Sequence, residues 1–207
     1  MNPFLHLEYN HISNYETNEL LGFSDDWCGR ITDEIRRNES LLARLLLNKI
    51  CKKTIHQSID EAAFSKKENG MPYFIKHPEL FISITHCQGH VWTAMANSPI
   101  GIDFEKIDPA CTDDLKIAFD DNDWEMVSGD CLGIYKYFSL KESYAKMTGT
   151  GFTQEPASIK LSQLQAKTFI NIFENKTNDY IFTLIAQNFD PNYFINLNQG
   201  FPELAYE

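Results

Sequence analysis

Two pairs of charged side chains have a spacing that could bring them together around a metal ion or a phosphate group. Asp103 and Glu105 are two residues apart in a short apolar segment. If this segment is a strand, both side chains project from the same face, because successive side chains alternate across a strand. Two carboxylates on one face repel each other, so this arrangement favours a positive charge between them, either a divalent cation or a Lys or Arg side chain.

The second pair, Glu142 and Lys146, is four residues apart in a segment that reads as a helix, so both side chains share one helix face. If that face packs against the strand of Asp103 and Glu105, three carboxylates converge beside one ammonium group. Three oxygen ligands suit Mg²⁺, which also binds phosphate oxygens, and Lys146 would act on that phosphate as a point charge. Each pair taken separately is common on solvated surfaces, so spacing alone supports only a candidate Mg²⁺ site.

The elements that must position these residues can be recognised from the apolar pattern. A helical face of leucines and Ile50 begins at Leu41, with Ser40 expected near the helix start. A long helix is predicted from about Ile134 to Met147, ended by Gly149 and Gly151. These two helices would precede and follow the strand that carries the carboxylates.

Short apolar and β-branched runs predict the strands. They lie at residues 80–84, 91–96, 100–104 and 180–186, with turns at 69–72, at Gly89 and at 97–99. We expect the first three strands to form one meander from Leu80 to Glu105. The order of helix, strands, helix and strand predicts an α+β fold. We expect two similar halves, residues 1–104 and 105–207, each a small and mostly antiparallel sheet packed with helices.

Composition excludes several classes of protein. The 207 residues include 29 acidic and 18 basic side chains, a net charge of −11, which argues against nucleic acid as a partner. The apolar runs are far shorter than the roughly 18 residues of a membrane span, and the N-terminus does not read as a signal peptide. The five cysteines are widely spaced without a C-x-x-C pair, which favours a reducing compartment. We therefore expect a cytoplasmic protein with no membrane partner.

The charge is unevenly distributed along the chain. Residues 101–130 contain ten acidic and two basic side chains, whereas residues 30–76 contain ten basic and six acidic ones. The first half thus offers cations for an anionic ligand, although charged runs are commonly solvated surface. His86, Cys87 and His90 form a further group of metal-ligating residue types, but the expected turn at Gly89 separates them and no second pair completes a zinc site.

Three stretches together resemble the 4′-phosphopantetheinyl transferases, specifically the larger single-chain type that activates surfactin synthetase. Residues 82–86 (ISITH) are similar to the family's N-[IVL]-S-H, and residues 99–105 (PIGIDFE) to its G-[IV]-D-[IV]-E. Residues 138–151 (FSLKESYAKMTGTG) are similar to its W-[ST]-x-K-E-[SA]-x-x-K-x-x-G-x-G. The resemblance extends over about residues 30 to 190 and implies a pseudo-dimer with coenzyme A in the cleft between two halves.

The resemblance also implies roles for individual residues. Asp103, Glu105 and Glu142 correspond to Mg²⁺ ligands, and Lys146 to the lysine that contacts the pyrophosphate of coenzyme A. The implied coenzyme A-binding residues are Arg36, Arg37, Ser40, Thr85, His86, Asp103 and Lys146, with the first two in a loosely aligned stretch. Glu142, Lys146 and Asp103 are the implied catalytic residues.

The implied reaction transfers the 4′-phosphopantetheine group of coenzyme A to a serine of an acyl or peptidyl carrier protein, with Mg²⁺ as cofactor. The proton acceptor is left open between Glu142, a metal-bound water and Asp123. The chain departs from the family at Phe138, where Trp is usual, and at Met71, where Lys is usual. The loss of that lysine removes one cation that could hold coenzyme A.

Two other functions stay open on the sequence. A Mg²⁺-dependent nucleotide pyrophosphatase or nuclease would also use two strand carboxylates and a lysine, and it would hydrolyse coenzyme A without a carrier protein. A protein that binds coenzyme A without catalysis is the third alternative. For the transferase we expect a monomer.

Overall fold

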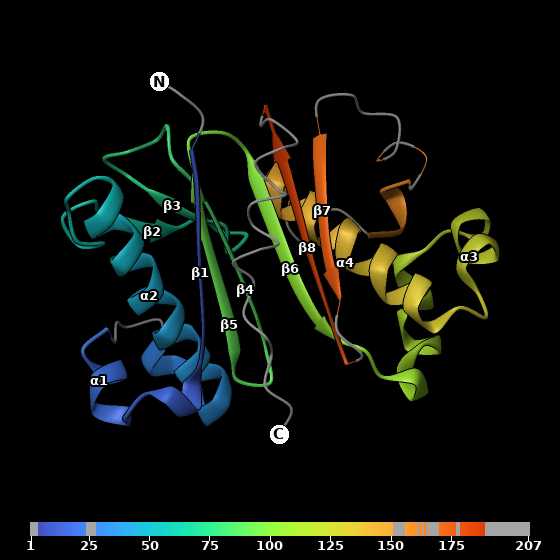
Figure 1. Cartoon of the computed structure of the whole chain (residues 1–207), viewed down its shortest axis with the longest axis horizontal. Coiled ribbons are helices and arrows are strands. Elements are labelled where there is room, and N and C mark those ends of the chain that lie inside the picture. Colours follow the sequence, from blue (N-terminus) through green and yellow to red (C-terminus); the bar gives the residue numbers. More distant parts are fainter. Residues whose placement is uncertain are drawn as a thin grey trace. The chain divides into compact units, whose positions relative to one another are not determined.

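A computed structural model describes residues 4–23, 28–150, 156–160, 162, 164, 170–176 and 179–188. The chain divides into two compact units, Met1–Ile100 and Gly101–Glu207. Each unit combines helices with a small sheet that contains antiparallel strands (Figure 1). The predicted mixed α+β class is therefore confirmed. None of the described helices combines the length and the apolar character needed to cross a membrane.

The sheet of the first unit has the strand order β1-β5-β4. Its strands are β1 (Leu5–His11), β4 (Phe81–Cys87) and β5 (His90–Ala96), and β5 pairs antiparallel with both neighbours. The strands predicted at 80–84 and 91–96 are thus confirmed. Their connection is a two-residue turn at Gln88 and Gly89, whose φ angles of 49° and 84° are typical of a tight hairpin.

Helix α2 (Glu34–Thr54) packs against β5 and forms the core of this unit (Figure 1). Leu47 and Ile50 lie in one apolar cluster with Ile82 and Met95 of the sheet. The helix begins earlier than predicted, because the Asp33 side chain caps it by accepting a hydrogen bond from the Arg36 backbone N–H. The expectation that Ser40 lies near the helix start is therefore wrong.

Smaller elements complete the first unit. Strands β2 (Phe64–Lys66) and β3 (Pro72–Phe74) form a hairpin, which confirms the turn predicted at residues 69–72. Helix α1 (Thr17–Leu21) contacts α2, and short 3₁₀ turns lie at Ile12–Asn14 and Cys28–Arg30.

The sheet of the second unit has the strand order β6-β8-β7. Its strands are β6 (Ile100–Lys106), β7 (Ile170–Lys176) and β8 (Tyr180–Gln187). The predicted meander is therefore wrong in its third strand, since β6 pairs in this second sheet. The physical reason is that β1 and β4 occupy both edges of β5, so no edge of β5 is left for β6.

Helix α4 (Cys131–Thr148) packs against β8 and confirms the long helix predicted from about Ile134 (Figure 1). It ends at Gly149 in the left-handed conformation, with φ of 70°. Gly151, the second predicted stop, lies outside the described residues. Helix α3 (Asp121–Val127) precedes α4, and 3₁₀ turns lie at Pro109–Cys111, Asp113–Ala118 and Pro156–Ser158.

Candidate functional site

Strand β6 and helix α4 bring charged side chains from distant parts of the sequence together. Lys146 Nζ on α4 lies 2.7 Å from Asp103 Oδ1 on β6. The Asp103 side chain is buried, and the Lys146 side chain is 28% exposed. The two segments that the sequence pairs only by hypothesis are therefore in direct contact.

Small side chains allow this close approach of β6 to α4. Gly101 faces the backbone of α4, where an added methyl group would overlap the carbonyl oxygen of Ser143. Ser139 and Ser143 on α4 each place their hydroxyl 2.8 Å from the Thr183 hydroxyl of β8. These contacts hold α4 tightly on the sheet and orient the face that carries Lys146.

The carboxylates at this junction influence one another's protonation. Burial raises the pKa of Glu105 to about 8; the charges of Asp103 and Glu142 also raise it, whereas Lys146 opposes this shift. Burial and then the charge of Asp103 raise the pKa of Glu142, again against Lys146. Asp103, Glu105 and Glu142 therefore form one electrostatically coupled group, referred to below as the carboxylate cluster.

The chemistry of the carboxylate cluster fits a hard divalent cation. All three side chains offer oxygen ligands, and a cation would offset the burial and the repulsion that raise the pKa values of Glu105 and Glu142. Among the described residues, no three His, Cys, Asp or Glu side chains are already arranged around a metal position. Asp103 instead pairs with the Lys146 ammonium group.

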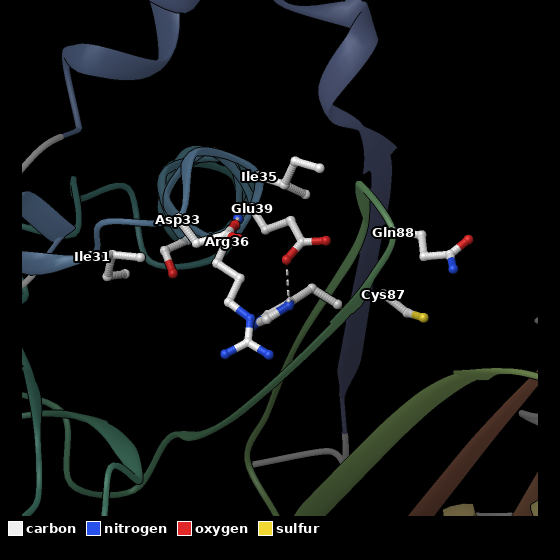
Figure 2. A pocket seen from close by; sticks show the side chains of 9 residues that line it. Ile31, Asp33, Ile35, Arg36, Glu39, Cys87 and Gln88 are labelled. Carbon is white, nitrogen blue, oxygen red and sulfur yellow. Dashed lines mark hydrogen bonds and ion pairs between the residues drawn. The ribbon is translucent and has the colours of Figure 1, made fainter. Parts of the chain in front are cut away.

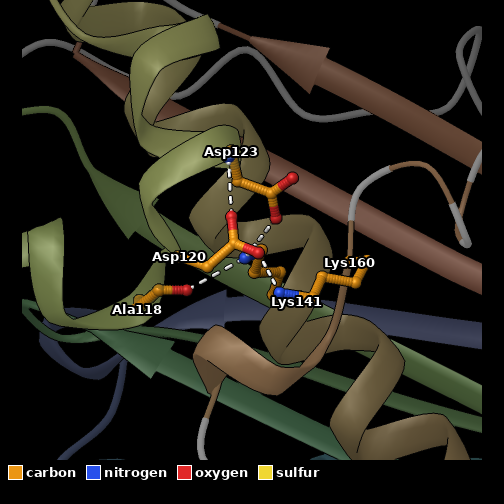
Figure 3. A network of polar contacts seen from close by, with 5 residues as sticks. All are labelled: Ala118, Asp120, Asp123, Lys141 and Lys160. Atoms are coloured by element: carbon orange, nitrogen blue, oxygen red, sulfur yellow. Dashed lines mark hydrogen bonds and ion pairs between the residues drawn. The ribbon is translucent and has the colours of Figure 1, made fainter.

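A buried polar network surrounds Lys141, the residue that precedes Glu142 on α4 (Figure 3). Lys141 has no exposed surface, and its Nζ donates to Asp123 Oδ2 and to the Ala118 carbonyl, both at 3.0 Å. Asp120 caps α3 by accepting from the Asp123 backbone N–H at 2.7 Å, and it pairs with Lys160. The network ties the segment before α3, α3 itself and α4 together next to Glu142.

This network bears on the open question of the proton acceptor. Asp123 is 6% exposed and its carboxylate accepts from the Lys141 ammonium group. A carboxylate held in a buried ion pair is a poor choice for taking a proton from an incoming substrate. The sequence did not reveal the role of Lys141, because a lysine next to a glutamate on a helix usually lies on the surface.

The first unit contains a separate pocket of about 640 Å³ beside α2 and the end of β4 (Figure 2). It is lined by Ile31, Asp33, Ile35, Arg36, Glu39, Ser40, His86, Cys87 and Gln88. Three of the predicted coenzyme A-binding residues therefore line the same pocket: Arg36, Ser40 and His86. Arg37 and Thr85 are not among its described lining residues, and the Thr85 side chain is buried.

Glu39 is a charged lining residue that the sequence analysis did not assign to a site. It is 2% exposed, and its two carboxylate oxygens lie 2.7 Å from His86 Nδ1 and from the Gly89 backbone nitrogen. Burial raises the pKa of Glu39, but the hydrogen bonds from His86 and Gly89 outweigh this effect and leave the pKa lowered. A glutamate three residues before the buried Leu42 on the same helix face was the available signal.

Comparison with known proteins gives a consistent result for the second unit. Residues 99–197 match the family model described as the 4′-phosphopantetheinyl transferase superfamily. This range contains Asp103, Glu105, Glu142 and Lys146. It does not contain the pocket beside α2.

Curated relatives carry the same description. The chain is 28% identical to "4′-phosphopantetheinyl transferase gsp" of Aneurinibacillus migulanus over 139 residues, which cover 63% of this chain and 56% of the relative. It is 25% identical to "4′-phosphopantetheinyl transferase" of Bacillus subtilis, over 61% of this chain and 58% of the relative. It is also 25% identical to "4′-phosphopantetheinyl transferase ffp" of Bacillus subtilis, over 88% and 84%. The chain thus spans little more than half the length of the first two relatives.

Proposed function

We propose that this chain, whose residues 99–197 match the 4′-phosphopantetheinyl transferase superfamily, transfers the 4′-phosphopantetheine group of coenzyme A to a serine of an acyl or peptidyl carrier protein. The serine oxygen forms a bond to the phosphorus of the pantetheine phosphate. The bond from that phosphorus to the leaving adenosine 3′,5′-bisphosphate breaks, and the serine proton is released. The observation that carries this proposal is the contact of Lys146 with Asp103 beside Glu105 and Glu142.

Asp103, Glu105 and Glu142 are the residues proposed to hold Mg²⁺. When bound, Mg²⁺ would supply positive charge for the pyrophosphate and the leaving group. Lys146 has the position and charge to bind a phosphate oxygen in exchange for its contact with Asp103. Glu142 is our first choice as acceptor of the serine proton, ahead of water.

The pocket beside α2 is proposed to bind the 3′-phosphate of coenzyme A. Arg36, Ser40 and His86 offer a guanidinium, a hydroxyl and an imidazole to this anion, and all three line the pocket. We also propose that Arg37 and Thr85, the sequence neighbours of Arg36 and His86, contribute to coenzyme A binding. The proposal includes a pseudo-dimer of two similar halves, residues 1–104 and 105–207, with coenzyme A between them.

The wider setting is part of the same proposal. We propose a cytoplasmic monomer that acts on coenzyme A and a carrier protein, without a nucleic acid or membrane partner. The net charge of −11 supports the exclusion of nucleic acid.

The test is to mix the protein with coenzyme A, Mg²⁺ and a panel of apo carrier proteins, and to measure the intact mass of each carrier. We expect at least one carrier to gain the mass of the phosphopantetheine arm. Hydrolysis of coenzyme A in the absence of any carrier would instead indicate a nucleotide pyrophosphatase. Binding of coenzyme A without either product would indicate a protein that binds this ligand without catalysis.

A further inference from the structure

The most unusual side chain outside the carboxylate cluster is Glu39. Its carboxylate is 2% exposed in the wall of a pocket that also contains Asp33 and Arg36. A buried carboxylate is unfavourable unless it is paired and hydrogen-bonded. Glu39 satisfies this requirement by accepting from His86 Nδ1 and from the Gly89 N–H, each at 2.7 Å.

These two hydrogen bonds determine how the imidazole of His86 is presented. An ionised carboxylate only accepts hydrogen bonds, and the lowered pKa of Glu39 keeps it ionised. His86 Nδ1 must therefore carry a proton, which leaves Nε2 as the ring nitrogen available to a ligand. Nε2 donates to a phosphate oxygen when the ring is protonated at both nitrogens. The dashed contact in Figure 2 joins Glu39 to this ring, while Cys87 and Gln88 point away from Arg36.

The same carboxylate also fixes the backbone at the hairpin turn. Gln88 and Gly89 both have positive φ angles, and the Gly89 N–H is directed to Glu39 Oε1. Helix α2 and the β4–β5 turn are thereby joined at one side chain. A displacement of Glu39 would alter both the ring and the turn that follows it.

We propose that Glu39 is a positioning residue that fixes His86 so that the pocket distinguishes a phosphate monoester from a free hydroxyl group. The inference rests on the proposed function, in which that monoester is the 3′-phosphate of coenzyme A. Glu39 does not contact the ligand itself in this proposal; it acts through His86.

The charges around the pocket indicate that Glu39 can favour phosphate binding only by orienting the His86 ring. Glu39 brings a negative charge to a site for an anion, and Asp33 adds another, although its side chain caps α2. Arg36 supplies a positive charge and contributes to the lowered pKa of Glu39. Since Glu39 would repel a phosphate through its charge alone, a gain in phosphate affinity from Glu39 must come through the ring that it orients.

The test compares the affinities of coenzyme A and 3′-dephospho-coenzyme A by calorimetry for the full chain and its Glu39→Gln variant. His86 and Gly89 contact different oxygens of Glu39, Oε2 and Oε1. In glutamine one of these two atoms becomes an NH₂ group, which donates and does not accept, so one of the two contacts is lost. We expect coenzyme A to bind about tenfold more weakly, the loss of a hydrogen bond that involves a charged group. The affinity for the dephospho ligand should stay within about twofold.

Two further single variants and a double variant keep the test decisive. Glu34→Gln removes the same charge from an exposed position in the first turn of α2, and we expect it to leave both affinities unchanged. Glu39→Asp retains two acceptor oxygens and should keep more of the discrimination than Glu39→Gln. In a His86→Gln background, Glu39→Gln should cause little further loss, because its effect is transmitted by the ring.

Several results would overturn the proposal. Equal weakening of both ligands by Glu39→Gln would indicate a structural role only, and unchanged affinities for both ligands would indicate no role. If the unsubstituted protein bound the two ligands equally, both this inference and the assignment of the pocket would be wrong. If it discriminated between them but modified no carrier protein, the proposed function would fail while the role of Glu39 would stand.

Discussion

Glu142 is the single acidic residue of α4, and it is buried beside two more carboxylates and a lysine. We predict that Glu142→Gln, which keeps the size of the side chain, lowers the turnover number by about 10²-fold or more, as expected for loss of a general base or metal ligand. The measurement is the rate of mass gain of a carrier protein at saturating coenzyme A. Retention of most activity would contradict the role proposed for this residue.

Glu39 should also leave a signature in the dependence of stability on pH. Its pKa is lowered in the folded protein, so its stabilising contribution is fully present above about pH 4.5 and is lost as the pH falls through the folded value. We predict that the free energy of unfolding of Glu39→Gln is lower than that of the unsubstituted protein near neutral pH. The difference should shrink below pH 4.5 in urea titrations; a difference that is constant with pH would contradict the pairing with His86.

The sequence predicted the carboxylate cluster better than its supporting residues. Strand periodicity places Asp103 and Glu105 on one face, and helix periodicity places Glu142 and Lys146 on another. Their convergence was a hypothesis, which the contact of Lys146 with Asp103 supports. Lys141 does not follow in this way, because its burial depends on Ala118 and Asp123 from other elements. A single helix pattern does not specify which charged residue will turn toward the core.

At the level of elements, the contact of β6 with α4 depends on a glycine. We predict that Gly101→Ala destabilises the protein by about 1–3 kcal/mol, because the methyl group would overlap the α4 backbone at Ser143. Thermal unfolding measures this change. Gly29→Ala is the matched control, since an added methyl group there meets no atom within 4 Å. Equal melting temperatures of the two variants would contradict the close packing of β6 on α4.

The network around Lys141 should hold α3 and α4 together. We predict that Lys141→Met lowers the free energy of unfolding by about 3–5 kcal/mol, because it leaves the Asp123 carboxylate buried without its lysine. Adding Asp123→Asn should restore part of this loss. Lys136→Met, a change of the same type at a more exposed position of α4, should have little effect in the same denaturant titration. Absence of any rescue in the double variant would argue against the ion pair as the cause.

Strand positions were more predictable than strand partners. The runs that form β4, β5 and β8 are short, apolar and β-branched, so local pattern identifies them. The partner of β6 was predicted wrongly, because strand order depends on which edges are already occupied. β1 was also missed, because its sequence, LHLEYNH, has none of the β-branched residues that marked the other strands. It fills the edge of β5 that the expected meander required.

At the level of the whole molecule, charge should govern the encounter with a carrier protein. The excess of basic residues between 30 and 76 lies within the first unit, and the acidic run 101–130 lies within the second. We predict that an acidic carrier binds through the basic segment. The kcat/KM for the carrier protein should then fall when the ionic strength rises from about 0.01 M to about 0.15 M. The reason is that the electrostatic screening length shortens from about 30 Å to about 8 Å over this range.

A charge variant identifies the segment responsible. Lys67→Gln removes one exposed cation of the basic segment and should reduce the salt dependence, whereas Lys116→Gln in the acidic run should not. A rate that is independent of salt would favour an apolar docking surface instead.

The described members of the carboxylate cluster all come from the second unit, and every described residue that lines the pocket beside α2 comes from the first. Recognition of the nucleotide end of a ligand and affinity for a cation would then be encoded in separate stretches of the gene. Mutagenesis of the gene segment for the first unit alone could therefore select variants with an altered nucleotide preference. The affinity of such variants for the cation should stay unchanged.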